Sequence, residues 1–209
     1  MALTKSGLLA LIGTNLPDND TALITPAKLR EVFTQSADSM AYAAAGFKEV
    51  EVLRAFATTT QQPSALNTPL QVTFGAAQGS ASDPVMINAA GLVTFNQAGN
   101  YAVRIKLQCG RLALAGQATV TTRILLNGTQ VGVPASVRID SSAQIVPTES
   151  RVVVNPVATN TFAVQIMRDS ADAGVNAGGI FAVTSGVAAW GISPSALLVI
   201  SRLEPVPSP

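Results

Sequence analysis

"GLVTFNQAGNYAVRIKLQ", residues 91–108, decides the fold of this chain. Two strand-like runs, residues 91–95 and 100–109, are separated by residues 96–99, and Gly99-Asn100 marks a reversal of the chain. Runs of this kind, bounded by Gly and Asn, are typical of short β-strands joined where the chain reverses. The stretch therefore predicts neighbouring strands of an antiparallel structure.

The same pattern continues on both sides of this stretch. Residues 47–56 and 69–74 alternate apolar and polar side chains with the period of two of a half-buried strand. Further strand-like runs are PVMIN, QATVTTRILLNG, TQVGVPASVRI, RVVVNP, NTFAVQIMR, GIFAV and PSALLVISRL. Asn127-Gly128 predicts a type I′ hairpin, which needs positive φ at both positions. Nine to eleven short strands without intervening helices indicate an antiparallel jelly-roll sandwich and disfavour a parallel α/β fold.

The first 46 residues follow a helical pattern instead. Thr25 is a suitable N-cap, and Pro26 then occupies the first helical position, where its missing N–H costs nothing. Apolar side chains recur at intervals of three and four residues at Leu29, Val32, Phe33, Ala37, Met40, Ala41 and Ala44. Gly46 is placed to end the helix. The apolar stripe is narrow, which favours packing against copies of itself or a partner.

The composition limits the partners of the chain. It is 48% hydrophobic and 12% charged, whereas a charged share of about 25% is usual, so we expect apolar surface to meet other chains. A net charge of +1 without a Lys/Arg run argues against nucleic acid. No apolar run approaches the ~20 residues that span a bilayer, so no membrane insertion is expected. "GLLALIG", residues 7–13, favours a short amphipathic helix over a secretion signal.

Catalytic chemistry has little basis in the sequence. The chain has no histidine, which removes Ser-His-Asp and Cys-His arrangements and the commonest transition-metal ligand. The one cysteine, Cys109, lies in an apolar run and is interpreted as a small buried thiol. We therefore expect a protein that is not an enzyme and has no cofactor.

Two features are candidates for a ligand loop. Asp169 and Asp172 could supply oxygen ligands to Ca²⁺, but we favour their serving turn geometry in a solvated loop, and predict no metal. Residues 173–196 are rich in Gly, Ala and Ser around Trp190. This segment could form a receptor-contacting loop with Trp190 as its anchor. Burial of Trp190 in the core, or at a seam between copies, is the favoured alternative.

Residues 91–108 resemble the jelly-roll family of tumour necrosis factor and the complement globular heads. In that family a strand ending in an aromatic is followed by a Gly-containing turn, an aromatic such as Tyr101 and a long apolar strand. "ILLNGTQVG" is similar to the next hairpin of such domains, and residues 193–204 to their closing strand. The similarity spans about residues 66–204. It implies a homotrimer in which apolar sheet faces meet along a three-fold axis.

Residues 16–39 are similar to the N-terminal stretch of tail-fibre, head-fibre and other surface proteins of tailed bacteriophages. The matching positions are Leu16-Pro17, Asn19, Ile24-Thr25-Pro26, Leu29-Arg30 and Asp38-Ser39. The resemblance implies a segment that attaches the protein to the virion. The residues expected to carry the attachment are Leu16, Pro17, Ile24, Pro26, Leu29, Arg30, Val32 and Phe33.

Together these patterns predict a non-enzymatic structural protein of the bacteriophage virion, assembled in the host cytoplasm. We expect an N-terminal helical anchor over residues 1–46 and a jelly-roll β domain over 47–209, with its core at about 66–204. The expected form is a trimeric head or neck decoration or fibre protein. Its expected partners are other copies, other capsid, neck or tail proteins, and a host surface receptor. The alternatives are a tail-fibre receptor-binding protein, a soluble carbohydrate- or receptor-binding jelly roll, and a hydrolase with an unfamiliar site.

Overall fold

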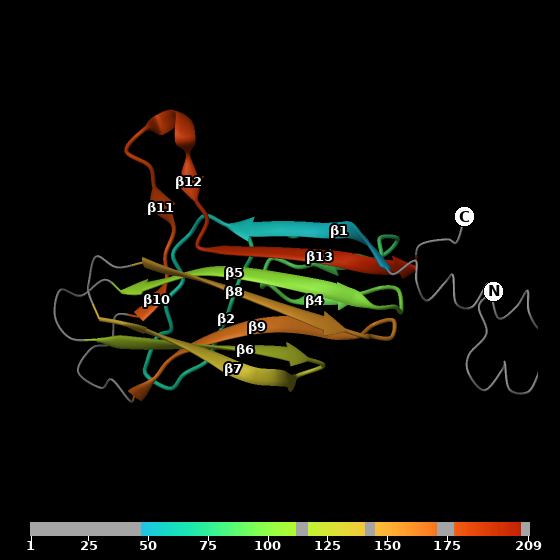
Figure 1. Ribbon diagram of the computed structural model, residues 1–209, viewed down its shortest axis with the longest axis horizontal. Coiled ribbons are helices and arrows are strands. Elements are labelled where there is room, and N and C mark those ends of the chain that lie inside the picture. The colour runs from blue at the N-terminus through green and yellow to red at the C-terminus, as the bar shows by residue number, and fades with distance from the viewer. Residues whose placement is uncertain (1–46, 112–116, 141–144, 171–177, 206–209) are drawn as a thin grey trace, which may run out of the picture. The chain divides into compact units, whose positions relative to one another are not determined.

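The computed structural model describes residues 47–111, 117–140, 145–170 and 178–205 (Figure 1). The predicted N-terminal helix lies outside these residues. The chain divides into two compact units, Met1–Lys48 with Leu203–Pro209, and Glu49–Arg202. Only the second unit is described over most of its length. It is an antiparallel β-sandwich, and its described residues contain a single short helical turn, the 3₁₀ helix η2, Ala188–Trp190.

Two sheets form the sandwich, drawn as two layers in Figure 1. The strands of the first sheet are β1 (Phe47–Ala57), β13 (Ala196–Pro205), β5 (Tyr101–Arg111), β8 (Ile145–Val154) and β10 (Gly178–Ile180). The strands of the second are β3 (Val85–Ile87), β4 (Val93–Phe95), β2 (Leu70–Gln71), β9 (Thr161–Arg168), β6 (Ala118–Leu126) and β7 (Thr129–Ile139). A separate pair consists of β11 (Val183–Thr184) and β12 (Ile192–Ser193).

The order of pairing is that of a jelly roll. Setting aside the short strands β2, β3 and β10–β12 leaves eight strands. The first of these pairs with the last (β1 with β13), the second with the seventh (β4 with β9), the third with the sixth (β5 with β8) and the fourth with the fifth (β6 with β7). This nested arrangement confirms the predicted antiparallel jelly roll.

The core lies between the sheets, where alternate side chains of each strand point inward. Along β5 the inward-facing row is the set Tyr101, Val103, Ile105, Leu107 and Cys109, all at least 98% buried. From the facing sheet, Phe162, Val164 and Ile166 of β9 pack into the same cluster. The ring of Phe95 lies 4.9 Å from that of Tyr101, centroid to centroid, and the Tyr101 hydroxyl donates to the carbonyl of Gln97 at 3.0 Å.

The predicted hairpin at Asn127-Gly128 is confirmed. Both residues have positive φ, 51° and 76°, and Leu126 pairs with Thr129 across the turn. Gly99 and Asn100 act differently from a hairpin turn, since β4 and β5, which flank them, belong to different sheets. Residues 96–100 carry the chain from one sheet to the other. Phe95 before them and Tyr101 after them are both buried in the shared core.

Two strands differ from their predicted form. β8 begins at Ile145, earlier than the apolar run that starts at Arg151, and pairs with β5 along its whole length. Its first half, IVPTE, has no continuous apolar run, and Ile145, Pro147 and Glu149 are exposed there. In β1 the predicted alternation changes phase, since Val50 and Val52 are only half-buried whereas Leu53 and Ala55 enter the core.

Gly91 allows two backbone segments to approach closely. Its φ is +80°, and a Cβ at this position would lie 2.0 Å from the carbonyl oxygen of Val72. Gly128 has a similar φ of +76°, but nothing lies within 4 Å of its added Cβ. Alanine substitutions at Gly91 and at Gly128 therefore distinguish the cost of backbone strain from the cost of steric overlap.

We predict that Gly128→Ala lowers the free energy of unfolding by about 1–2 kcal/mol, the cost of a left-handed non-glycine residue. Gly91→Ala should lower it by roughly a further 1–3 kcal/mol, because the methyl group overlaps backbone that has no room to move. Denaturant unfolding of both variants measures the difference. Equal losses would contradict the close approach at Gly91.

Candidate functional site

Several exposed apolar side chains of the described chain lie on one hairpin that leaves the sandwich. We call residues 183–193 the arm; it consists of β11, η2 and β12, and Figure 1 shows it pointing away from the two sheets. Val183 pairs with Ser193 and Thr184 with Ile192. Its exposed apolar side chains are Val183, Val187, Trp190 and Ile192, and Trp190 at the tip is 84% exposed. A lone two-stranded hairpin is marginally stable in water, so the arm is suited to contact a partner.

Gln108 of β5 holds both legs of the arm at their base. Its carbonyl accepts from the amide of Phe181 on the incoming leg, at 2.9 Å. On the outgoing leg its amide donates to the carbonyl of Ser195 at 2.9 Å, and its side-chain Nε2 donates to the carbonyl of Pro194 at 2.7 Å and to the Ser193 hydroxyl. One residue therefore fixes where the arm leaves the sheet.

Ser195 strengthens the same junction. It is fully buried, its amide donates to the carbonyl of Ala57 at 2.8 Å, and its hydroxyl donates to the carbonyl of Thr59 at 2.6 Å. A buried hydroxyl with a satisfied donor stabilises the fold, whereas an unsatisfied one would cost free energy. The start of β13 is thus tied to the end of β1 as well as to β5.

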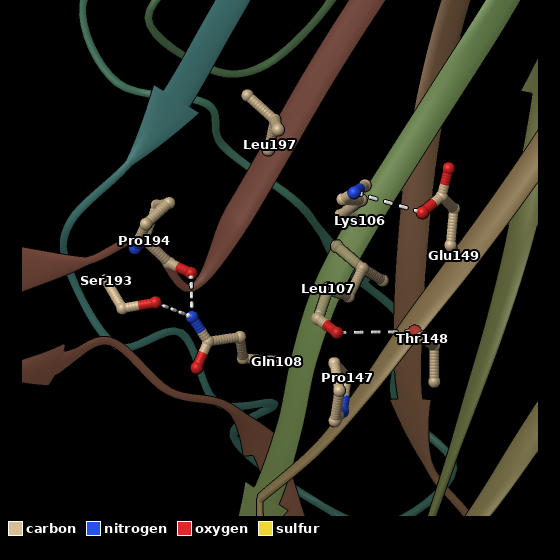
Figure 2. Close-up of a pocket in the computed structure, with 9 residues that line it drawn as sticks. All are labelled: Lys106, Leu107, Gln108, Pro147, Thr148, Glu149, Ser193, Pro194 and Leu197. Atoms are coloured by element: carbon tan, nitrogen blue, oxygen red, sulfur yellow. Dashed lines mark hydrogen bonds and ion pairs between the residues drawn. The ribbon is translucent and has the colours of Figure 1, made fainter.

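A cleft of about 580 Å³ opens on the outer face of the first sheet beside this junction (Figure 2). We call it the arm-base cleft; its lining residues are Lys106, Leu107, Gln108, Pro147, Thr148, Glu149, Ser193, Pro194 and Leu197. Lys106 Nζ lies 3.1 Å from Glu149 Oε2, and the Thr148 hydroxyl donates to the carbonyl of Leu107 at 3.4 Å. The cleft combines proline and leucine surface with the Lys106–Glu149 ion pair and uncharged polar groups, a lining that suits a flat amphipathic group.

The centre of that outer face is charged. The ion pairs are Arg54 with Glu51, Arg104 and Lys106 with Glu149, and Arg151 with Glu49. These side chains are about half exposed, so solvent screens each pair and its contribution to stability is small. The apolar sheet face expected at a three-fold axis is therefore not found here, because the strands place charged residues outward. Within Glu49–Arg202, the large exposed apolar side chains on the strands of this sheet are only Phe56, Ile145 and Val153.

The predicted ligand residues fall in different places. Trp190 is at the tip of the arm, so its burial in the core of its own chain is ruled out. Asp169 follows β9, where its amide donates to the carbonyl of Thr119 at 2.9 Å. Asp172 and the eight expected attachment residues lie outside the described residues. Among residues that the structure describes, no three Cys, Asp or Glu side chains are grouped as a metal site would require.

Gln108, Lys106 and Pro194 were not singled out from the sequence. Each stands in a strand or loop whose pattern is ordinary, and only the meeting of β5, β8 and β13 brings them together. For Pro194 and the arm the sequence holds one indirect signal, since residues 173–201 contain no charged side chain.

Comparison with known proteins assigns no family. No protein-family model and no curated protein matches the chain. Among solved structures, the chain is similar to the globular domain of the zebrafish complement 1qA protein, with a TM-score of 0.37 and 14% sequence identity over 77% of this chain and 99% of that one. A likeness at this level carries no conclusion about function. In the part of the chain that the structure covers, no helix has the length and apolar character needed to cross a membrane.

Burial makes Cys109 a poor nucleophile. Its side chain lies in the core, and burial raises the pKa of the thiol to about 11, although a weak contact with the Thr148 hydroxyl at 3.9 Å acts in the opposite direction. The thiolate is the reactive form of cysteine. Cys109 therefore has a structural role, as its apolar surroundings in the sequence predicted.

We expect Cys109 to resist alkylation at pH 8 in the native protein and to react fully in denaturant. As the pH rises, the thiol of the unfolded chain ionises near its ordinary pKa of about 8.5. The thiol of the folded chain stays protonated to a higher pH. The resulting stability is complete below about pH 8.5 and is lost as the pH rises towards 11. Unfolding curves of Cys109→Ala should lack this part of the alkaline loss, and an identical pH profile would contradict the shift.

Removing the Gln108 clamp should loosen the arm without unfolding the body. Gln108→Ala deletes two side-chain hydrogen bonds, and we expect a loss of about 1–2 kcal/mol. Hydrogen exchange of amides 183–193 should accelerate, while exchange in β6 and β9 stays unchanged. Gln165→Ala is the matched control, since Gln165 bonds Arg123 on the other sheet. Equal exchange of the arm in both variants would contradict the clamp.

Proposed function

We propose that this chain is a non-enzymatic structural protein of a tailed-bacteriophage particle. Residues 1–46 would anchor it to the virion, and the jelly roll would be displayed as a trimer. The observation that carries the proposal is the resemblance of residues 16–39 to the N-terminal stretch of phage surface proteins. Its narrow apolar stripe is suited to docking, because an isolated helix of this kind is barely stable in water.

Three properties of the chain support this role. An arm with four exposed apolar side chains requires a covering partner. The absence of histidine, together with the absence of a Cys/Asp/Glu group of three among the described residues, gives catalysis no evident site. The low charged fraction of 12% suits a chain whose surface is covered in an assembly.

A head or neck decoration or fibre protein is favoured over a tail fibre, since no repetitive shaft separates residues 1–46 from the β domain. A receptor-binding role is the second candidate, and the exposed Trp190 at the tip of the arm favours it. Particles that lack the protein distinguish the two. Normal adsorption to host cells supports decoration, whereas loss of adsorption supports receptor binding.

We predict that deleting residues 1–46 leaves a folded trimer that no longer joins particles, because the anchor is lost while the body is kept. Within the full chain, Leu29→Asp places a charge in the apolar stripe and should reduce incorporation. Lys28→Asp lies outside that stripe and serves as the matched control. Sedimentation gives the number of copies, and immunoblots of purified virions give incorporation. A truncated protein that still decorates virions would exclude the anchor.

A further inference from the structure

The arm and the arm-base cleft are complementary surfaces of one chain. We propose that the arm of one copy docks on a second copy, so that Trp190 enters the neighbour's arm-base cleft and three such exchanges close a ring. The inference rests on the proposed function only in requiring that copies associate. It identifies Trp190 as the residue that each copy contributes to the arm-base cleft of the next copy.

Trp190 does not reach the cleft of its own chain. Ser193 lines that cleft, and Trp190 stands three residues earlier on the leg that leads outward. Trp190 itself belongs to the 3₁₀ turn η2, is 84% exposed and is not among the residues that line the cleft. The bonds from Gln108 to Ser193 and Pro194 fix the base of this leg (Figure 2), and the arm points away from the two sheets (Figure 1). The indole is thus presented to another molecule.

The cleft has the chemistry that an indole requires. Pro147, Pro194 and Leu197 provide apolar contact for the ring. The ammonium group of Lys106, which is paired with Glu149 at 3.1 Å and is half exposed, is the cation at the cleft wall that a cation–π contact would use. A buried indole also needs an acceptor for its N–H. Gln108 Oε1 accepts no hydrogen bond within the described residues, since only the amide nitrogen of that side chain is used.

A second copy fits better than an unrelated protein. The arm carries no charge, so it has none of the electrostatic features that select a different partner. Each copy has one arm and one cleft, and a head-to-tail contact of unlike surfaces closes into a ring when the rotation permits. A buried tryptophan supplies about 150–250 Å² of contact, a substantial part of the ~800 Å² per partner in a standard interface. The charged face beside the cleft would complete the contact.

Trp190 is the single tryptophan of the chain, so its fluorescence reports this contact alone. The full-length protein, at a concentration where sedimentation gives three copies, should show blue-shifted emission and weak quenching by acrylamide. Leu197→Arg fills the cleft from a half-exposed position. We expect it to shift the emission to the red and to raise the quenching constant severalfold. Val133→Arg, at a site 90% exposed on β7 of the other sheet, should change neither.

Cross-linking provides a second measurement that does not depend on filling the cleft. In the full chain, Val187→Cys on the arm combined with Pro147→Cys keeps Trp190, and it should form disulfides between copies under mild oxidation and give covalent species of up to three chains. Val187→Cys combined with Val133→Cys is the matched control and should remain monomeric on a denaturing gel.

The outcomes separate the inference from the proposed function. A three-copy assembly whose tryptophan emission is that of a water-exposed indole overturns the arm exchange and leaves the trimer intact. Emission that is blue-shifted but insensitive to Leu197→Arg, with no cross-link through Pro147→Cys, also overturns the exchange. Single copies at every concentration overturn both the exchange and the proposed trimer.

Discussion

The fold depends on burial of the inward-facing side chains of β5 between the two sheets. Each of Val103, Ile105 and Leu107 is almost fully buried, and such burial contributes about 1.5–3 kcal/mol per side chain. β5 also has three partner strands, since β8 pairs along one edge and β13 and β10 share the other. Once this row is placed, the registers of these three strands follow, because a slip by one residue would turn the apolar set to solvent.

The same strand connects the core to the candidate site. Leu107 and Cys109 face the interior, whereas Lys106 and Gln108 alternate with them on the outer face. Gln108 then holds the legs of the arm, and Lys106 lines the arm-base cleft. The position of an exposed, apolar hairpin is therefore determined by the packing of the core on the other side of one strand. This explains how a short arm can be presented in a defined direction.

Much of the fold was predictable from local patterns. Asn127-Gly128 predicted its turn correctly because the requirement for positive φ depends on two residues alone. The strand-like apolar runs at residues 100–109 and 160–168 predicted β5 and β9, since such runs bounded by Gly and Asn are visible in the sequence. The first half of β8 was missed because Pro147 and Glu149 face outward there. The crossing at Gly99 was interpreted as a simple reversal, since the sequence does not show which sheet a strand joins.

The candidate site was less predictable. Trp190 was singled out by its type, but its exposure depends on a hairpin of two-residue strands too short to show a period. The cleft requires β5, β8 and the start of β13 to meet, and these lie up to about 90 residues apart in the sequence. Side chains brought together over such separations leave no local signal. The anchor residues and Asp172 remain predictions.

The nested pairing has a consequence for how the polypeptide acquires its structure during synthesis. β1, the first strand, pairs with β13, the last, and β13 also pairs with β5. Contacts between segments so distant in the chain are slow to form, because a long loop must close first. The hairpin β6–β7 can form as soon as it leaves the ribosome, but the edge of β5 stays unpaired until nearly the whole chain has been translated. A nascent chain stalled before residue 196 would therefore expose an aggregation-prone strand edge.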